Sequence, residues 1–117
     1  MQNTLTGPCH MPDNPDAPLV LRIEAGQWDV YRIDEFVAQI VPSYEHPNVI
    51  FDMSEVEYVD STVLGAFARK RKIRAAKGWK PSRLVLAPAV RRIFERVHFD
   101  EVWPIFETLE SALDRAC

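Results

Sequence analysis

Residues 48–65 constrain the fold of this chain most, because they lead from a buried strand through a short polar turn into a helix. Residues 49–51, Val-Ile-Phe, are apolar and β-branched enough for a strand that is buried on both faces. Asp60-Ser61-Thr62 comes directly before apolar residues spaced three and four apart, which predicts a helix. The apolar residues of this predicted helix face are Val63, Leu64, Phe67 and Ala68. Small polar residues cap helix N-termini, so the sequence presents a hydroxyl at the start of this helix.

Short apolar runs elsewhere predict further strands. We expect strands at residues 19–23 and 83–87, and a last one at 102–106. Pro104 cannot donate a ladder hydrogen bond, so this last strand must lie at a sheet edge. Gly26-Gln27-Trp28-Asp29 is predicted to be a turn, in which Trp28 is either an exposed anchor for a partner or a packing residue.

One-sided apolar patterns between these strands predict helices. Asp29 is the expected N-cap of the first helix, and the helix that starts near Thr62 should end at Gly78. Further helices follow Pro88 and begin near Leu109. The predicted buried face of the first helix is Val30, Ile33, Val37, Ile40 and Val41. Strands that alternate with helices predict an α/β fold with a small, mainly parallel sheet of about four to five strands.

The 117 residues are enough for one domain with a single modest core. Residues 1–18 contain four prolines and are predicted to be a flexible, Pro-rich N-terminal arm, whereas residues 19–117 form the domain. Neither a signal peptide nor a membrane-spanning run is apparent. Cys9 and Cys117 lie far apart without a metal or disulfide spacing, so we expect free thiols in the cytoplasm.

Charge gives little indication of nucleic-acid binding. The net charge is −3, and no known DNA-binding motif is present. Six basic residues nevertheless lie close together on the central helix: Arg69, Lys70, Arg71, Lys72, Arg74 and Lys77. They form either a solvated helix face or a docking surface for an acidic partner or for phosphates.

The residues around Ser61 do not form a recognisable catalytic site. Adjacent Asp60 and Ser61 cannot form a triad, and the turn lacks the glycines of a nucleophile elbow. The three histidines, at 10, 46 and 98, lack metal-ligand spacing, and no Gly-rich loop could bind phosphates. The sequence therefore predicts a protein that is not an enzyme and that binds no metal or cofactor.

Several of these segments together resemble the STAS domain family of anti-sigma factor antagonists and sulfate-transporter domains. The resemblance covers about residues 19–113, and its most specific motif is Asp60-Ser61-Thr62-Val63-Leu64-Gly65. The other matching segments are residues 48–54, 58–59, 84–87, 90–94 and 109–113. Val63 stands where the family usually has glycine, which enlarges and stiffens the turn.

The resemblance implies a regulated protein-binding module. Ser61 matches the serine that a partner kinase phosphorylates, with Thr62 as a minor candidate, and Asp60 matches the neighbouring aspartate. Asp29 matches an acidic residue near the kinase nucleotide site, so the implied partner surface comprises Trp28, Asp29, Asp60, Ser61, Thr62 and Val63. The kinase is also an anti-sigma factor, and it would supply ATP and Mg²⁺ itself.

Three alternatives to this role remain open at this point. Ser61 could be only a helix cap. The protein could be the cytoplasmic STAS subunit of a lipid-trafficking ABC transporter, with Ser61 and Thr62 in constant contact with an ATPase subunit. It could also be a scaffold in a larger signalling assembly. In every case the expected partner is a protein, with no nucleic acid and no direct membrane insertion.

Overall fold

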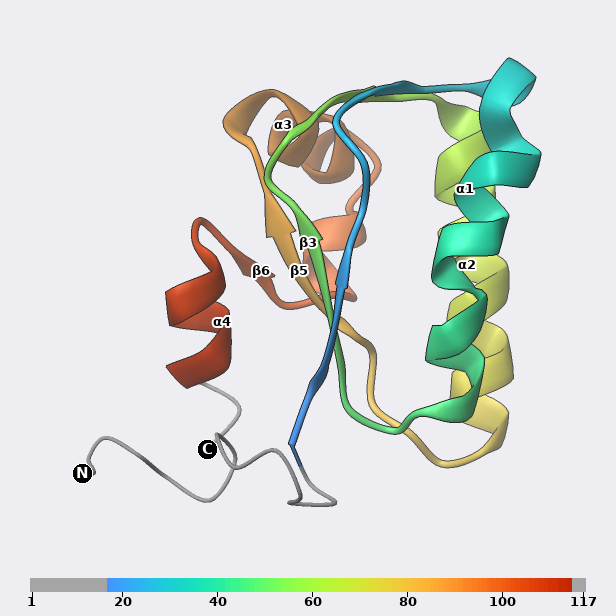
Figure 1. Ribbon diagram of the computed structural model, residues 1–117, viewed down its shortest axis with the longest axis vertical. Helices are drawn as coiled ribbons and strands as arrows, with labels where there is room; N and C mark the ends of the chain where they lie inside the picture. Colours follow the sequence, from blue (N-terminus) through green and yellow to red (C-terminus); the bar gives the residue numbers. More distant parts are fainter. Residues whose placement is uncertain (1–16, 115–117) are drawn as a thin grey trace.

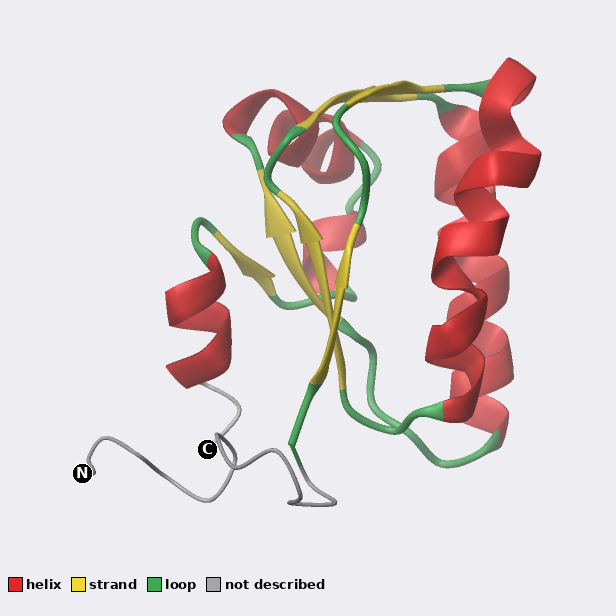
Figure 2. Ribbon diagram, in the orientation of Figure 1, coloured by secondary structure: helices red, strands yellow, loops and turns green. Residues whose placement is uncertain are grey.

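The computed structural model describes residues 17–114, and its centre is a four-stranded sheet in which every pair of neighbouring strands is parallel (Figures 1 and 2). The strand order is β1-β3-β5-β6. The strands are β1 (Leu19–Arg22), β3 (Val49–Met53), β5 (Arg83–Leu86) and β6 (Ile105–Phe106). This arrangement confirms the predicted α/β fold, and β6 lies at an edge as Pro104 requires. The predicted N-terminal arm lies mostly outside the described residues, as do both cysteines.

A second, two-stranded sheet was not predicted. It pairs β2 (Gly26–Trp28) with β4 (Val56–Val59) in parallel. The prediction of a turn at Gly26–Trp28 is therefore wrong. β2 has only three residues, one of them Gly26 at φ +112°, and β4 is buried at its two ends but exposed in the middle. Neither segment has the alternation that marks a strand, so only their pairing makes them one.

Helices cover both faces of the main sheet. Helices α1 and α2 lie side by side against one face, and α4 lies on the other (Figure 1). The α-helices are α1 (Ile33–Ile40), α2 (Ser61–Ala76), α3 (Pro88–Arg96) and α4 (Leu109–Asp114). Between residues 17 and 114, the chain also forms three short 3₁₀ helices, η2 (Val30–Arg32), η3 (Val41–Glu45) and η4 (Phe99–Glu101). No helix in residues 17–114 is both long and apolar enough to cross a membrane.

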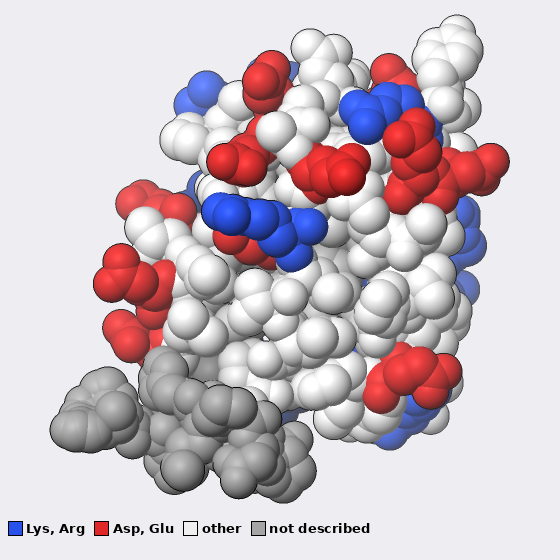
Figure 3. All heavy atoms as spheres, in the orientation of Figure 1, with Lys and Arg blue, Asp and Glu red and all other residues white. Residues whose placement is uncertain are grey.

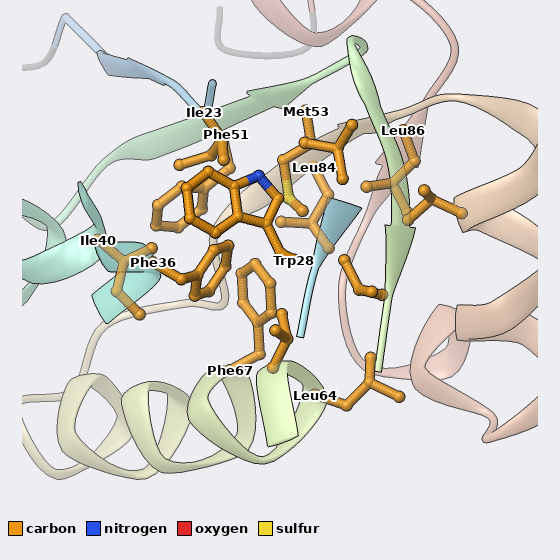
Figure 4. Close-up of a cluster of buried hydrophobic side chains, with 14 of the residues drawn as sticks. Ile23, Trp28, Phe36, Ile40, Phe51, Met53, Leu64, Phe67, Leu84 and Leu86 are labelled. Carbon is orange, nitrogen blue, oxygen red and sulfur yellow. The ribbon is translucent and has the colours of Figure 1, made fainter. Parts of the chain in front are cut away.

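The main core lies between the sheet and the α1–α2 layer, and its centre is aromatic (Figure 4). Phe67 makes edge-on ring contacts with Phe36 at 5.5 Å and with Phe51 at 5.7 Å between centroids. Trp28 packs against Phe36 at 5.8 Å. Rings in such tilted arrangements stabilise a core beyond the area that they bury. On the other face, Ala112 of α4 packs against Ile50 and Val85 of the sheet in a smaller cluster.

The structure corrects two details of the predicted helix faces. Val30 and Val41 are exposed because they belong to the 3₁₀ helices at the two ends of α1, and Phe36 is buried instead. A 3₁₀ turn has three residues rather than 3.6, which changes the face on which a residue lies. In α2, Ala68 is exposed whereas Ala66 is buried.

Two residues of the predicted basic face are buried. Lys70 is 0 % exposed and donates a hydrogen bond to Ser82 Oγ at 2.9 Å. Arg74 is 1 % exposed, and its guanidinium binds backbone carbonyls of the loops below α2. These carbonyls belong to Ser43, His46, Pro47 and Lys80. The interpretation of the whole basic run as one solvated face is therefore wrong, and only part of it reaches the surface.

Candidate functional site

The turn between β4 and α2 presents Ser61 as an exposed residue. Asp60 has extended backbone angles and is the N-cap of α2, because its Oδ1 accepts a hydrogen bond from the Val63 amide at 3.1 Å. Ser61 is the first residue of the helix, and its hydroxyl makes no hydrogen bond within residues 17–114. Asp60 thus provides the helix cap, and the alternative that Ser61 serves only as a cap is wrong.

Asp60 also joins this turn to the one that follows β2. Its second carboxylate oxygen, Oδ2, accepts a hydrogen bond from the Val30 amide at 2.8 Å, and its own amide donates to the Trp28 carbonyl at 3.2 Å. Asp29 is the N-cap of η2, as predicted for the helix start, through a 3.0 Å bond from the Tyr31 amide. The parallel pairing of β2 and β4 therefore brings Asp29 and Ser61 to the same end of the molecule.

Exposed apolar side chains surround this end. Tyr31 is 92 % exposed, Val30 is 51 % exposed and Tyr58 is 45 % exposed. We call these three residues the apolar rim. Sequence reasoning missed Tyr31 and Tyr58, although Tyr31 lies only two residues after the predicted N-cap Asp29. Exposed tyrosines are common anchors in protein interfaces, because they bury a large area at a small entropic cost.

Two residues of the predicted partner surface are buried instead. Trp28 is 0 % exposed, its Nε1 donates to the Glu24 carbonyl at 3.0 Å, and Arg32 stacks over its ring. Val63 is also 0 % exposed and faces the main core. Neither side chain can form part of an exposed contact surface. Asp29, Asp60 and Thr62 are partly exposed and Ser61 is exposed, so these four remain candidates.

The end that carries Ser61 is acidic. In Figure 3, acidic side chains gather on the upper part of the visible face, with some basic side chains among them, above a largely uncharged band. Exposed acidic residues lie in the loops before β2 and β4, in β4 itself and in the first turn of α1: Glu24, Glu55, Glu57, Asp34 and Glu35. A negative charge added at Ser61 would therefore join a surface that already carries exposed carboxylates.

The described residues do not offer a metal site near this turn. Nowhere in residues 17–114 do three or more His, Cys, Asp or Glu side chains gather closely enough to hold a metal ion. A cleft of about 560 Å³ lies at the opposite end of the sheet, between the starts of β3 and β5 and beside Trp79 and Arg83. The exposed groups at the Ser61 end are its hydroxyl, the carboxylates and the apolar rim, and these suit contact with a partner and modification of the hydroxyl.

Comparison with known proteins gives both a family match and solved structures of the same fold. The model of the STAS domain family matches residues 10–112. Among solved structures, a candidate anti-sigma factor antagonist from Thermotoga maritima has a TM-score of 0.68 at 17% identity, over 85% of this chain and 86% of its own.

Two further solved structures share the fold. The anti-sigma factor antagonist SpoIIAA in its unphosphorylated form has a TM-score of 0.66 at 20% identity, over 84% and 86% of the two chains. A sulfate transporter family protein from Wolinella succinogenes has a TM-score of 0.65 at 17% identity, over 85% and 84%. At these identities the structures establish the fold.

Proposed function

The chain belongs to the STAS domain family, and we propose that it is an anti-sigma factor antagonist regulated by phosphorylation of Ser61. In this proposal the protein binds an anti-sigma serine kinase while Ser61 is unmodified, and releases it once Ser61 is phosphorylated. The protein itself needs no cofactor, because ATP and Mg²⁺ are bound by the kinase. Thr62, which is less exposed than Ser61, is the minor candidate for the acceptor.

The observation that carries this proposal is that Asp60, and not Ser61, makes the hydrogen bonds that hold this turn. Asp60 already uses one carboxylate oxygen to cap α2 and the other to hold the two turns together. Ser61 has no structural hydrogen bond within residues 17–114, so a kinase can modify its hydroxyl without breaking any contact there. The apolar rim lies at the same end and offers the kinase an anchoring surface.

Phosphorylation at this position should change binding far more than it changes folding. A phosphate adds about −1.5 to −2 charges and three acceptor oxygens. The first turn of a helix tolerates such a charge because its amides and the helix dipole are positive there. An interface formed around a neutral hydroxyl does not tolerate it, since a desolvated charge without a partner is costly. The negative carboxylates of Asp29 and Asp60 lie at the same end and repel the phosphate. A coupling of about 1–3 kcal/mol would change affinity roughly 5–150-fold.

The proposal is tested by affinity capture from native lysate with four baits. These are the wild-type protein, Ser61→Ala, Ser61→Asp and, as a matched charge control, Ala68→Asp, which places the same charge on an exposed position of α2. We expect the wild type, Ser61→Ala and Ala68→Asp to retain a kinase-type anti-sigma factor and Ser61→Asp to lose it. Mass spectrometry of the wild-type bait should find phosphate on Ser61.

The opposite result would favour a transport role. If all four baits retain one transporter ATPase and Ser61 carries no phosphate, the switch is refuted and the accessory-subunit alternative replaces it. If the baits retain only copies of the same chain within a larger assembly, the scaffold alternative replaces it. The accessory-subunit and scaffold roles both need a constitutive contact. In either role, Ser61→Asp should therefore not lose a partner that the other three baits retain.

A further inference from the structure

Helix α2 carries an arginine on the same surface row as Ser61. Ser61, Gly65 and Arg69 follow one another at intervals of four residues, and such residues lie one above the other on a helix. Ser61 and Arg69 are exposed, and Gly65 is partly exposed. The three positions therefore form a continuous strip from the first residue of the helix to its third turn.

The side chain of Arg69 extends along this strip toward Ser61. A Cβ atom placed on Gly65 would lie 3.8 Å from Arg69 Nη1. The guanidinium group therefore lies beside Gly65, the residue one turn closer to the start of α2. Ser61 is one further turn away, which corresponds to about 5–6 Å between Cβ positions. Gly65 has no side chain to separate the two groups.

Arg69 has no competing acidic partner in the described part of the chain. The ion pairs between residues 17 and 114 involve Arg22, Arg32, Arg91 and His98. Arg69 forms none of them, and its guanidinium donates no hydrogen bond there. Its planar group of N–H donors matches the oxygens of a phosphate, which it binds more specifically than a lysine ammonium does.

We propose that Arg69 binds the phosphate on Ser61 across Gly65 and holds it against the surface of α2. This inference rests on the proposed function, because it requires Ser61 to be modified. The carboxylates of Asp29 and Asp60, and that of Glu57 on β4, lie at the same acidic end and oppose a further negative charge. Arg69 offsets this repulsion within the molecule, so that the phosphorylated form keeps its fold and presents the phosphate in one orientation.

The test uses protein in which phosphoserine is incorporated at position 61 during synthesis, so that no kinase is needed. The phosphate is titrated by ³¹P NMR in otherwise wild-type protein, in Arg69→Gln and in the control Arg71→Gln. Arg71 has the same charge and is exposed on the same helix, but it is off the Ser61–Arg69 row. A nearby cation favours the dianion, so the second pKa of the phosphate should be about 0.5 unit lower in the wild type than in Arg69→Gln. Arg71→Gln should titrate like the wild type.

A second variant tests the path between the two groups. In Gly65→Leu, Arg69 is kept but a side chain lies between it and the phosphate. A Cβ at residue 65 would make only ordinary contact with its surroundings, the position is partly exposed, and leucine favours a helix more than glycine does, so this variant should fold. We expect its phosphate to titrate like that of Arg69→Gln.

Two results would overturn the inference: equal phosphate pKa values in wild type and Arg69→Gln, or equal shifts in Arg69→Gln and Arg71→Gln. The first would show no interaction, and the second a general effect of charge. Because the phosphoserine is built in, neither result depends on whether a kinase binds in the cell. Failure of the proposed function would appear separately, as the absence of phosphate on Ser61 in the native protein.

Discussion

Lys70 is a buried cation without an acidic partner among residues 17–114, and replacing it by methionine should stabilise the protein at neutral pH. Its side chain is fully buried, and its Nζ lies 2.9 Å from Ser82 Oγ and 4.5 Å from the centroid of the Phe51 ring. Burial, and to a lesser extent the charge of Arg74, lower the pKa of Lys70 from 10.5 to about 7. Methionine has a similar length and carries no charge to desolvate.

The size of the effect follows from this lowered pKa. A difference of about 3.5 pH units between the unfolded and folded chains, at about 1.4 kcal/mol each, sets an upper limit of about 5 kcal/mol. The substitution also leaves Ser82 without its partner, which costs about 1–3 kcal/mol. It also removes the cation–π contact with Phe51, worth about 2 kcal/mol at most when desolvated. Subtracting these costs from the upper limit, Lys70→Met should raise the free energy of unfolding by up to about 4 kcal/mol at pH 7.

The same shift predicts how stability depends on pH. Between pH values of about 7 and 10.5 the unfolded chain binds a proton at Lys70 that the folded chain has lost. The free energy of unfolding therefore rises with pH through this window and is flat below it, as far as this residue is concerned. Relative to Lys70→Met, the wild type should gain about 3 kcal/mol between pH 7 and pH 9.5.

Urea unfolding at pH 7 and pH 9.5, followed by tryptophan fluorescence, measures both effects. Lys72→Met is the matched control, because Lys72 is exposed on the same helix and its removal should change stability by less than about 0.5 kcal/mol. The reasoning is refuted if Lys70→Met is less stable than the wild type at pH 7 and the two proteins share the same pH dependence. That outcome would mean that Lys70 is stabilised as a cation in the folded state.

Three further substitutions test other contacts through stability, measured by thermal unfolding, and a fourth tests the apolar rim. Asp60→Ala removes a helix cap and the bond from the Val30 amide and should cost about 2–3 kcal/mol. Asp29→Ala, which removes one local cap, should cost about 1 kcal/mol, and equal losses would show that Asp60 does not join the turns. Trp28→Ala should cost about 3–5 kcal/mol, and a cost below about 1 kcal/mol would contradict its burial. Tyr31→Ala should leave the melting temperature unchanged but weaken partner binding at least about tenfold in calorimetry, and unchanged affinity would remove Tyr31 from the interface.

The candidate site was predictable where one local motif determines the local structure. The sequence places Ser61 at the start of a helix, with Asp29 starting another helical segment, and the structure confirms both positions. It could not distinguish Asp60 from Ser61 as the cap, because both residue types cap helices well. That choice depends on the Val30 amide, which reaches Asp60 from a turn thirty residues away.

The sequence by itself determined the elements that local patterns encode. The buried strand β3, the strand β5 and the long helix α2 with its end near Gly78 all lie where apolar periodicity and helix-end signals predict them. Their order also predicts the parallel sheet, because parallel strands need crossover connections. These features depend on residues that are near one another in the chain.

The tertiary structure alone decided which side chains are buried where the local pattern is polar or too short. β2 and β4 become strands only by pairing with each other, and this pairing takes Trp28 into the core. Lys70 and Arg74 are buried because hydroxyl and carbonyl oxygens from distant loops surround them. A basic residue is buried only where the rest of the fold provides such partners, and nothing in its neighbouring sequence reveals them.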